Sequence, residues 1–552
     1  MRVLVALALG LTSALLPVGP TAAALVGDAS PLRPVVEHGV LLFRALLLVH
    51  AVLLALAVQL RPVVAGPPLV ASVVREPGAP SRWEWALLGL ILLVAEALRL
   101  YGLGHGLWFD EIRTLVTYVR LPVREIVATF DSQNQHMLYS LSARAVVAAV
   151  GESAWALRLP AVVFGVASLG ALYWFGRLIA DRREALLAIA FLAVSYHHIW
   201  FSQNARGYTG LMLWTVIASG VFLTSLASGG AGGWRLPLAY GASMALAAYT
   251  HITALFVMAA HGLVLAVVLW RQRQAGLRYA SVWQPLLGFV LAGTFTLQLY
   301  ALVLPQLLGV LLEPTMAAVD IEWKDPAWLV AETIRGMAVG VPGGPLMLLL
   351  AAVVLGAGGL SYLRQRPVAL AVMVLPGVLT AVALLALAHN LWPRFFFSLA
   401  GFAVLIVFRG GFSLAELALP ARWAPAATAA AALVILATAP LVVRAWGPKQ
   451  DYLAAGEFIR RSQTDGDAVV TIDMSAVPYA PYAGSGWTEV RTARQLQAIE
   501  RSHSRTWLVY TFAARLAALQ PEIWQRVQTE YRTAAEFPGT VSGGTIVVKV
   551  HP

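Results

Sequence analysis

Two adjacent carboxylates, Asp110 and Glu111, follow a long apolar segment and an aromatic pair at positions 108–109. Acidic residues at the start of a helix commonly cap it, because the helix dipole favours negative charge there. A cap accounts for either acid alone but does not explain the whole string His105–Glu111. Since consecutive helical residues point about 100° apart, only one of the two acids needs to face a cleft. The pair is therefore a candidate for chemistry as well as for capping.

Four further strings combine hydrogen-bonding, basic and titratable side chains near the ends of apolar segments. They are Asp131–Tyr139 with His136, Ser202–Tyr208 with Arg206, Tyr249–His251, and His389–Phe395 with Arg394. An arginine at the end of a span can simply extend its head group to the lipid surface. Arg206 and Arg394 are expected on the side opposite to the basic loops, next to Tyr, His and Asn. An anionic partner explains that placement.

The composition excludes a soluble globular protein. Of the 552 residues, 59% are hydrophobic and only 12% are charged, against about 45–50% and about 25% in an average soluble protein. This balance predicts a polytopic α-helical membrane protein. The net charge of +11 is spread over short links such as 182–183 and 271–273, which argues against a nucleic-acid partner. The absence of cysteine excludes a disulfide framework and thiolate metal sites.

Apolar runs of about 17–23 residues, the length that crosses a membrane, predict about 13 spans. They lie near 3–26, 38–60, 84–103, 161–180, 185–202, 208–228, 236–250, 253–270, 284–304, 343–363, 367–388, 395–409 and 424–444. The first run also resembles a secretory signal, but its length favours an uncleaved span. The basic links fall on one side of the membrane if every run crosses once. This orientation places 104–160, 305–342 and everything after about 445 on the outer side.

The predicted organisation has three parts: two additional N-terminal spans in 1–83, a transmembrane module in 84–445 and an extracytoplasmic domain in 446–552. Apolar residues at helical spacing predict interfacial helices in the outer loop 104–160. After residue 445 the polar content rises, which predicts a small soluble α/β domain. Its expected strands lie at 468–472, 507–510 and 544–550, and its expected helices at 451–461 and 513–531.

The strings, in this order, resemble the GT-C membrane glycosyltransferases. They are most similar to bacterial relatives of the dolichyl-phosphate-mannose–protein mannosyltransferases and of the lipid A aminoarabinose transferases. The strings that carry the resemblance are Leu107–Glu111, His136–Tyr139, Glu152–Pro160, His198–Tyr208 and Pro393–Phe395. The chain differs from the family in lacking prolines after His136, and in having Asn204 where Glu is common and Phe395 where Tyr is common.

The resemblance implies an enzyme of the bacterial plasma (inner) membrane that transfers a hexosyl or pentosyl group from a polyprenyl-phosphate donor. The acceptor would be a hydroxyl of a glycan, lipid or protein on the outer face, as in cell-envelope glycosylation. It implies Asp110 as general base of an inverting displacement, with Glu111 orienting the acceptor or supporting Asp110. The implied donor phosphate and sugar ligands are His136, Tyr139, Arg206, Tyr208, His251 and Arg394.

A divalent metal stays open as a cofactor, because some GT-C relatives use one. The candidate ligands here are Glu111, His136, His251 and His389, which show no compact ligand spacing. Two other functions remain as alternatives. An oligosaccharide ligase or polymerase would place its key residues in the late loop 305–342, which contains Glu313, Glu322, Lys324, Asp325, Glu332 and Arg335. A secondary transporter would need ionisable groups near mid-membrane, where the chain has few, and inverted repeats, which the sequence does not show.

Overall fold

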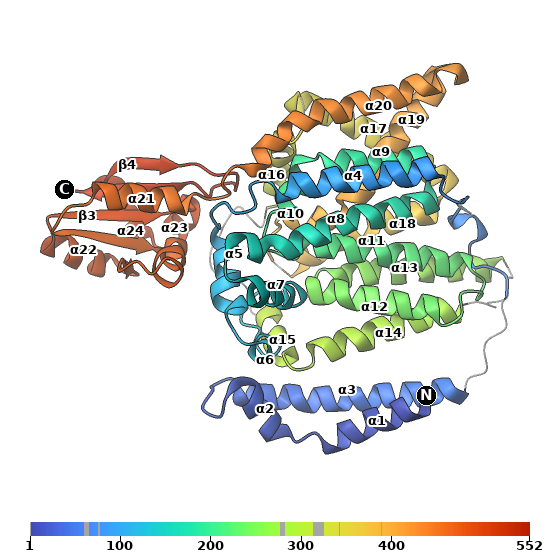
Figure 1. The fold of residues 1–552 in the computed structure, drawn as a ribbon, viewed down its shortest axis with the longest axis horizontal. Coiled ribbons are helices and arrows are strands. Elements are labelled where there is room, and N and C mark those ends of the chain that lie inside the picture. Colours follow the sequence, from blue (N-terminus) through green and yellow to red (C-terminus); the bar gives the residue numbers. More distant parts are fainter. Residues whose placement is uncertain are drawn as a thin grey trace.

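The structure, a computed structural model, describes residues 2–59, 66–75, 78–275, 282–312, 325–341, 343–387 and 389–552. Long helices form a bundle, and a small mixed domain lies at one end of it (Figure 1). Glu313, Glu322 and Lys324 of the late loop, three of the six charged residues behind the ligase alternative, lie outside the described residues. Of the other three, Asp325 caps α16, and Glu332 pairs with Arg335.

The helices before the small domain alternate between long bundle helices and short connecting ones. They are α1 (Arg2–Leu15), α2 (Val18–Val26), α3 (Arg33–Gln59), η1 (Ala71–Val73), α4 (Arg82–Leu100), α5 (Phe109–Thr114), η2 (Leu115–Val119), α6 (Val123–Ile126), α7 (Met137–Val150), α8 (Ala154–Ile179), α9 (Arg182–Ala193), α10 (Tyr196–Ser202), α11 (Tyr208–Ala227), α12 (Arg235–Thr250), α13 (Ala254–Gln274), α14 (Trp283–Tyr300), α15 (Leu304–Leu312), α16 (Pro326–Val339), α17 (Gly344–Gln365), α18 (Pro367–Ala386), η4 (Pro393–Leu399), α19 (Ala400–Ala418), η5 (Ala421–Trp423), α20 (Ala424–Thr438) and η6 (Ala439–Trp446).

Within the described ranges, eight helices are long and apolar enough to cross a membrane, or up to eleven if each of three bent pairs is one span. The sequence predicted about 13, and each predicted run coincides with one of these helices or with α4 or α12. Helix α4 carries Arg82, Glu84, Glu96 and Arg99, and α12 has only 16 residues, so neither meets the length and composition expected of a span. Both nevertheless run alongside the other bundle helices (Figure 1).

The break between α9 and α10, which bends the pair by 63°, is held by a buried arginine. Arg99 of α4 donates to the carbonyls of Leu192 and Ala193 at 3.0 Å each, at the end of α9. It also contacts His198 Nδ1 of α10 at 2.8 Å. Carbonyls at a helix C-terminus carry partial negative charge, so they compensate a cation that has no acidic partner there. This bend brings the segment 202–208 to the end of the bundle.

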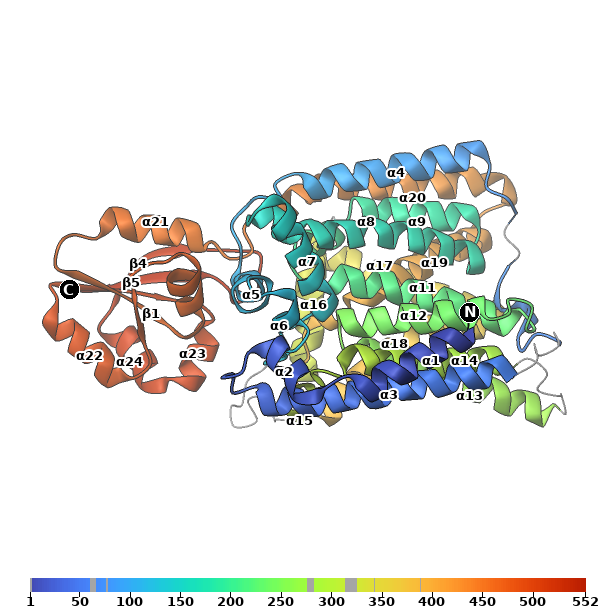
Figure 2. The same cartoon turned by 60° about the horizontal axis from the view of Figure 1, so that its bottom comes forward.

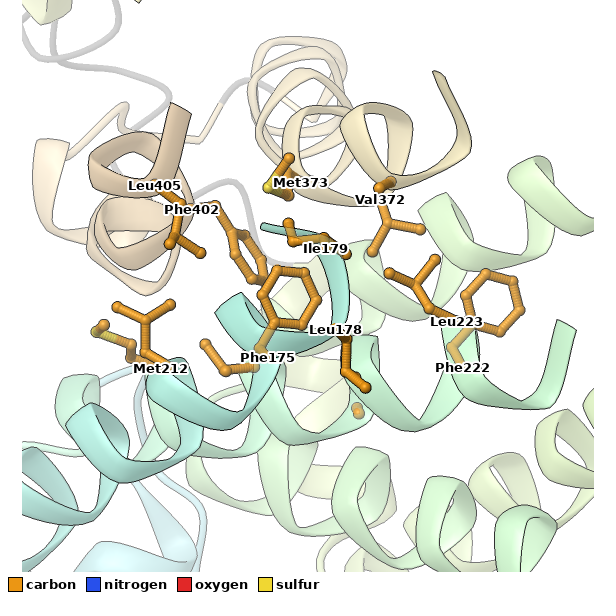
Figure 3. Packing of buried hydrophobic residues seen from close by; sticks show 14 of the residues in the cluster. Phe175, Leu178, Ile179, Met212, Phe222, Leu223, Val372, Met373, Phe402 and Leu405 are labelled. Carbon is orange, nitrogen blue, oxygen red and sulfur yellow. The ribbon is translucent and has the colours of Figure 1, made fainter. Parts of the chain in front are cut away.

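The interior of the bundle is a continuous apolar core around α8 and α11, with α18 and α19 packed against them. Figure 3 shows part of this core, where Phe175 of α8 lies against Phe402 of α19 with ring centroids 4.9 Å apart. Helices α17 and α19 cross with their backbones in contact. A Cβ added at Gly358 or at Gly410 would lie 1.9 Å from a carbonyl oxygen of the opposite helix, so only glycine fits at this crossing.

The C-terminal domain is a five-stranded sheet with helices, in the order β2-β1-β3-β5-β4. Strand β1 is parallel to β2 and β3, whereas β5 is antiparallel to β3 and β4. The elements are α21 (Tyr452–Ser462), β1 (Asp467–Ile472), η7 (Asp473–Ser475), η8 (Pro478–Tyr482), β2 (Thr488–Val490), α22 (Ala493–Ser502), β3 (Arg505–Tyr510), α23 (Ala513–Leu519), α24 (Pro521–Thr529), β4 (Arg532–Phe537) and β5 (Ile546–His551). The three predicted strands correspond to β1, β3 and β5. The predicted helix 513–531 is two helices, and β2 and β4 were not predicted.

The domain and the loop that contains α5 and α7 share one apolar cluster. Trp108, Phe109 and Ile112 from the loop pack in the same cluster as Tyr452 and Val548 from the domain. Both views place the domain beside α5 at the end of the bundle (Figures 1 and 2). The loop 104–160 is therefore enclosed between the bundle and the C-terminal domain.

Candidate functional site

A cavity of about 180 Å³ opens at the end of the bundle beside α5. Its lining is polar and comes from segments far apart in the sequence. The lining residues are Asp110, Gln133, Asn134, Arg206, Tyr208, His251, Asn390, Trp392, Arg394 and Phe395. Five of the residues expected from the sequence therefore meet at one cavity: Asp110, Arg206, Tyr208, His251 and Arg394.

Asp110 is the second residue of α5, and its side chain faces the cavity with 12% of its surface exposed. Its Oδ2 atom lies 3.3 Å from an Nη atom of Arg394. In the described part of the chain no backbone N–H donates to this carboxylate, so Asp110 does not act as a helix cap. Asp110 is thus an acceptor that faces the cavity.

Glu111 has the opposite environment, because its side chain is fully buried. It forms a bidentate pair with Arg158 of α8, at 2.7 Å from Nε and 2.6 Å from Nη2. It also accepts the backbone N–H groups of Trp108 and Ala205. Burial alone would raise the pKa of Glu111, but the paired Arg158 and the Ala205 N–H bring that pKa below its ordinary value. Glu111 therefore fixes α5 and the segment before α11 against α8.

Arg158 completes this anchor on its other side. It donates to the carbonyl oxygens of Leu103, His105 and Gly106, at 2.7 to 3.0 Å. One guanidinium thus fixes both the approach to α5 and its first turn. Arg158 lies within the string Glu152–Pro160, but nothing in the sequence shows that it pairs with Glu111.

Arg206 joins three segments of the cavity wall. One of its Nη atoms donates to Thr114 Oγ1 at 3.1 Å and to the carbonyl of Asn134 at 2.5 Å, and the other lies 2.8 Å from His136 Nε2. The other ring nitrogen of His136 accepts the N–H of Gly207 at 2.9 Å. Burial, and then the charge of Arg206, lower the pKa of His136 far below its ordinary value, so its ring is neutral.

The second of the expected sugar ligands on this segment, Tyr139, lies away from the cavity. Its side chain is fully buried and its hydroxyl donates to the carbonyl of Leu157 at 2.5 Å. His136 and Tyr139 are both absent from the cavity lining. The structure places them behind the wall, where they connect α7 to Arg206 and to α8.

Both cavity arginines have unused donors. The buried Nε atoms of Arg206 and Arg394 have no hydrogen-bond partner among the residues that the structure describes. The Arg394 guanidinium also lies 4.6 Å from the centre of the Trp392 ring. Two guanidinium groups in the lining of one cavity can together bind an anion.

His251 and Tyr208 form the aromatic part of the wall. Their ring centroids lie 5.7 Å apart, and Phe395 and His136 lie 5.5 and 4.7 Å from His251. Burial, followed by the charges of Arg206 and Arg394, lowers the pKa of His251 to about 3. A neutral imidazole of such low basicity is suited to hydrogen bonding rather than to taking up a proton at neutral pH.

The four proposed metal ligands do not fit a divalent cation. Glu111 is occupied by Arg158, and both ring nitrogens of His136 face donors. His251 lies beside two arginines, and His389 Nε2 contacts the carbonyl of Leu311 at 3.3 Å. Within the described ranges, no three His, Asp or Glu side chains are grouped to hold a metal ion.

Two buried residues between η6 and α21 also contact the elements around the cavity, and neither was expected from the sequence. Lys449 donates to the carbonyl of Gln203 at 2.7 Å, and its ammonium lies 5.0 Å from the centre of the Trp200 ring. Gln450 accepts the N–H of Phe109 at 3.1 Å. A Lys-Gln pair after a span looks like an ordinary surface turn, so the sequence carries no signal for either role.

Comparisons with known proteins give matches in structure only. No family model matches the chain, and no curated protein matches it. The apo structure of ArnT from Cupriavidus metallidurans is similar, with 13% identity, a TM-score of 0.48, and coverage of 85% of this chain and 97% of that one.

Two further solved structures are similar at the same level. The apo oligosaccharyltransferase from Archaeoglobus fulgidus has 11% identity and a TM-score of 0.47, over 84% of this chain and 74% of that one. The arabinosyltransferase EmbB from Mycobacterium smegmatis has 13% identity and a TM-score of 0.43, over 83% and 47%. All three are GT-C glycosyltransferases, the class that the motifs resemble. At these identities the likeness concerns the fold alone.

Proposed function

We propose that this protein is a membrane glycosyltransferase that moves a sugar from a polyprenyl-phosphate donor to an acceptor hydroxyl. The observation that carries the proposal is the cavity beside α5, where one carboxylate, Asp110, faces two arginines, Arg206 and Arg394. This set of charges fits a reaction with one proton to remove and one anion to stabilise.

The chemistry follows from the leaving group. A polyprenyl phosphate departs as a stable anion and needs no proton, so a general acid is unnecessary. Asp110 takes the proton of the acceptor hydroxyl while that oxygen forms a bond to the anomeric carbon. The bond between this carbon and the phosphate oxygen breaks, and its electron pair leaves with the phosphate. A single displacement of this kind inverts the anomeric configuration.

The arginines supply the complementary charge. A guanidinium has five N–H donors in a planar fork that matches phosphate oxygens. Arg394 uses one of them on Asp110, and its side chain remains 28% exposed at the cavity, where it can also contact the donor. Preorganised donors directed at developing negative charge are among the strongest contributions to catalysis. Tyr208 and His251 are then placed to bind hydroxyl groups of the sugar.

Hydrolysis of glycosides fits the cavity less well. Glycosidases use two carboxyl groups, one as acid and one as base or nucleophile. Asp110 is the single acidic residue in the lining of the described cavity, and Glu111 is held by Arg158. We also propose, from the basic links, that the cavity and the C-terminal domain face away from the cytoplasm.

The direct test uses purified protein with radiolabelled polyprenyl-phosphate sugars and glycan, lipid or protein acceptors. Replacement of Arg394 by lysine keeps the charge but loses the fork, and replacement by alanine loses both. We expect Arg394→Ala to weaken donor binding more than Arg394→Lys, since a hydrogen bond to a charged group is worth about 1.5–3 kcal/mol.

Arg444→Ala is the matched control, because Arg444 is exposed and donates to the carbonyl of Val339 away from the cavity. Thermal unfolding in detergent reports folding for all three variants. Unchanged donor affinity in a folded Arg394→Ala protein would show that Arg394 does not bind the donor.

A further inference from the structure

The short segment Pro448–Gln450, which enters the C-terminal domain, runs directly past the helix that carries Asp110. Its backbone is clamped by the domain, since the carbonyls of Pro448 and Lys449 accept the N–H groups of Thr540 and Val541 at 2.9 and 3.1 Å. A Cβ added at Gly539 would lie 2.1 Å from the Lys449 carbonyl oxygen. The position of this segment is therefore set by the domain.

Gln450 uses both ends of its side-chain amide. The Nε2 group donates to Thr511 Oγ1 and to the carbonyl of Gly544, at 3.1 Å each. The Oε1 atom accepts the N–H of Phe109 at 3.1 Å, and the residue is 1% exposed. One end is thus fixed in the C-terminal domain, and the other end holds the first residue of α5.

Helix α5 depends on such contacts for its orientation. It has six residues and continues directly into the five residues of η2, and isolated helices shorter than about 12 residues are marginal in water. The first N–H groups of any helix lack partners inside the helix, and here Gln450 satisfies the N–H of the residue directly before Asp110. Without Gln450, this buried N–H would have no acceptor among its described neighbours.

We infer that Gln450 is a positioning residue of the transfer site, through which the C-terminal domain sets the orientation of Asp110 toward the acceptor. The inference rests on the proposed function for the role of Asp110. The contact between Gln450 and Phe109 can be tested without it.

The test compares Gln450→Met, which keeps the length of the side chain and loses both hydrogen-bonding ends, with Thr540→Val. Thr540 is the matched control, because its hydroxyl accepts the indole N–H of Trp200 at 2.8 Å across the same domain boundary, and none of its hydrogen bonds in the described structure goes to α5. We expect Gln450→Met to lower kcat about 10- to 100-fold, the cost of a small misplacement of a catalytic group. The KM for the donor should change much less than kcat, because Arg206 and Arg394 are carried by other elements and each has one described hydrogen bond to α5.

Two readouts separate positioning from general stability. In an Asp110→Asn background, Gln450→Met should cause no further slowing, because its effect acts through Asp110. In hydrogen exchange, the amide of Phe109 should exchange about 3- to 10-fold faster in Gln450→Met, as expected for one lost hydrogen bond. Thr540→Val should change neither readout.

The outcomes distinguish the inference from the function on which it rests. Equal slowing by Gln450→Met in the wild-type and Asp110→Asn backgrounds would overturn the positioning role, as would unchanged exchange at Phe109. Faster exchange with an unchanged kcat would show that Gln450 caps α5 without positioning Asp110. That result would also overturn the inference. An Asp110→Asn enzyme that runs at the wild-type rate would instead remove Asp110 as the base.

Discussion

Asp110 and Glu111 are neighbours in the chain but differ in what their side chains can do. Asp110 is the acidic residue of α5 that lines the described cavity. Its one side-chain partner in the described structure is Arg394. Glu111 has no access to the cavity and is bonded to Arg158 and to two backbone N–H groups. The roughly 100° between successive helical residues produces this division.

Asp110→Asn keeps the shape of the side chain but cannot take up a proton. We expect the transfer rate to fall about 10²–10⁴-fold, the usual cost of removing a positioned base, while donor affinity is retained. Asp131→Asn is the matched control, because Asp131 is exposed, bonds to the Tyr118 hydroxyl and does not line the cavity. The transfer rates of both variants, measured at saturating donor, test whether Asp110 is the base. A wild-type rate for Asp110→Asn together with a slow Asp131→Asn would assign the base to Asp131.

Glu111→Gln should act on folding rather than on chemistry alone. It leaves Arg158 buried without a full counter-charge, and breaking a buried pair typically costs about 3–5 kcal/mol. Glu152→Gln is the matched control, because the Glu152–Arg120 pair is well exposed, and such surface pairs are worth about 0–1 kcal/mol. Thermal unfolding in detergent should show a large drop for the first variant and almost none for the second. Equal drops would refute the anchoring role.

At the scale of elements, the sequence predicted the apolar helices well and the bends between them poorly. Long apolar runs identify helices by composition, but composition alone does not give the 85° bend after α1 or the 96° bend after α14. The predicted helix 513–531 failed at Pro521, which begins α24 instead of continuing α23. Strand β4 was missed because its residues are mostly exposed, so no buried alternation marks it.

The sequence identified some residues of the candidate site and missed others, because a sequence pattern does not show tertiary contacts. Asp110, Arg206 and Arg394 stand out because they are charged residues on the side expected to lie opposite to the basic loops. His136 and Tyr139 stood in similar strings, yet they lie behind the cavity wall. Gln450 joins Phe109 across more than three hundred residues of sequence, and no local pattern reports such a contact.

The junction between η6 and α21 should make stability depend on pH through Lys449. Burial, and then the charge of Arg158, lower the pKa of Lys449 to about 7, although Glu111 opposes the shift. Below about pH 7 the residue is charged in both the folded and the unfolded states, and the cost of burying the charge is complete. Above it, the folded state loses the proton before the unfolded state does, so stability rises with pH.

We therefore expect the unfolding temperature of the wild type to rise relative to that of Lys449→Met as the pH is raised from about 7 to about 9. The comparison cancels the other groups that titrate in this range. Differential scanning fluorimetry in detergent at a series of pH values measures it. If the two unfolding temperatures change in parallel with pH, the pKa of Lys449 is not lowered in the folded state.

At the scale of the whole molecule, the arrangement of basic residues predicts one orientation. Arg271 and Arg273 lie in the last turn of α13, at the end of the bundle away from the cavity. The positive-inside rule places such a cluster in the cytoplasm. A topology reporter fused after residue 448 should then be active outside the cytoplasm, and one fused near Arg273 inside it. The opposite pattern would reverse the orientation of the proposed site.

The order of the strands has a consequence for the synthesis of the chain. The last strand to be made, β5, lies between β3 and β4 and contributes Ile546 and Val548 to the cluster that covers α5. Until those residues leave the ribosome, β4 lacks its partner and the apolar face around Phe109 lacks its cover. Domains generally fold as units during synthesis, starting from the N-terminus. Here the loop around Phe109 waits for β5, so a chain that stops before β5 exposes apolar surface instead of a finished site.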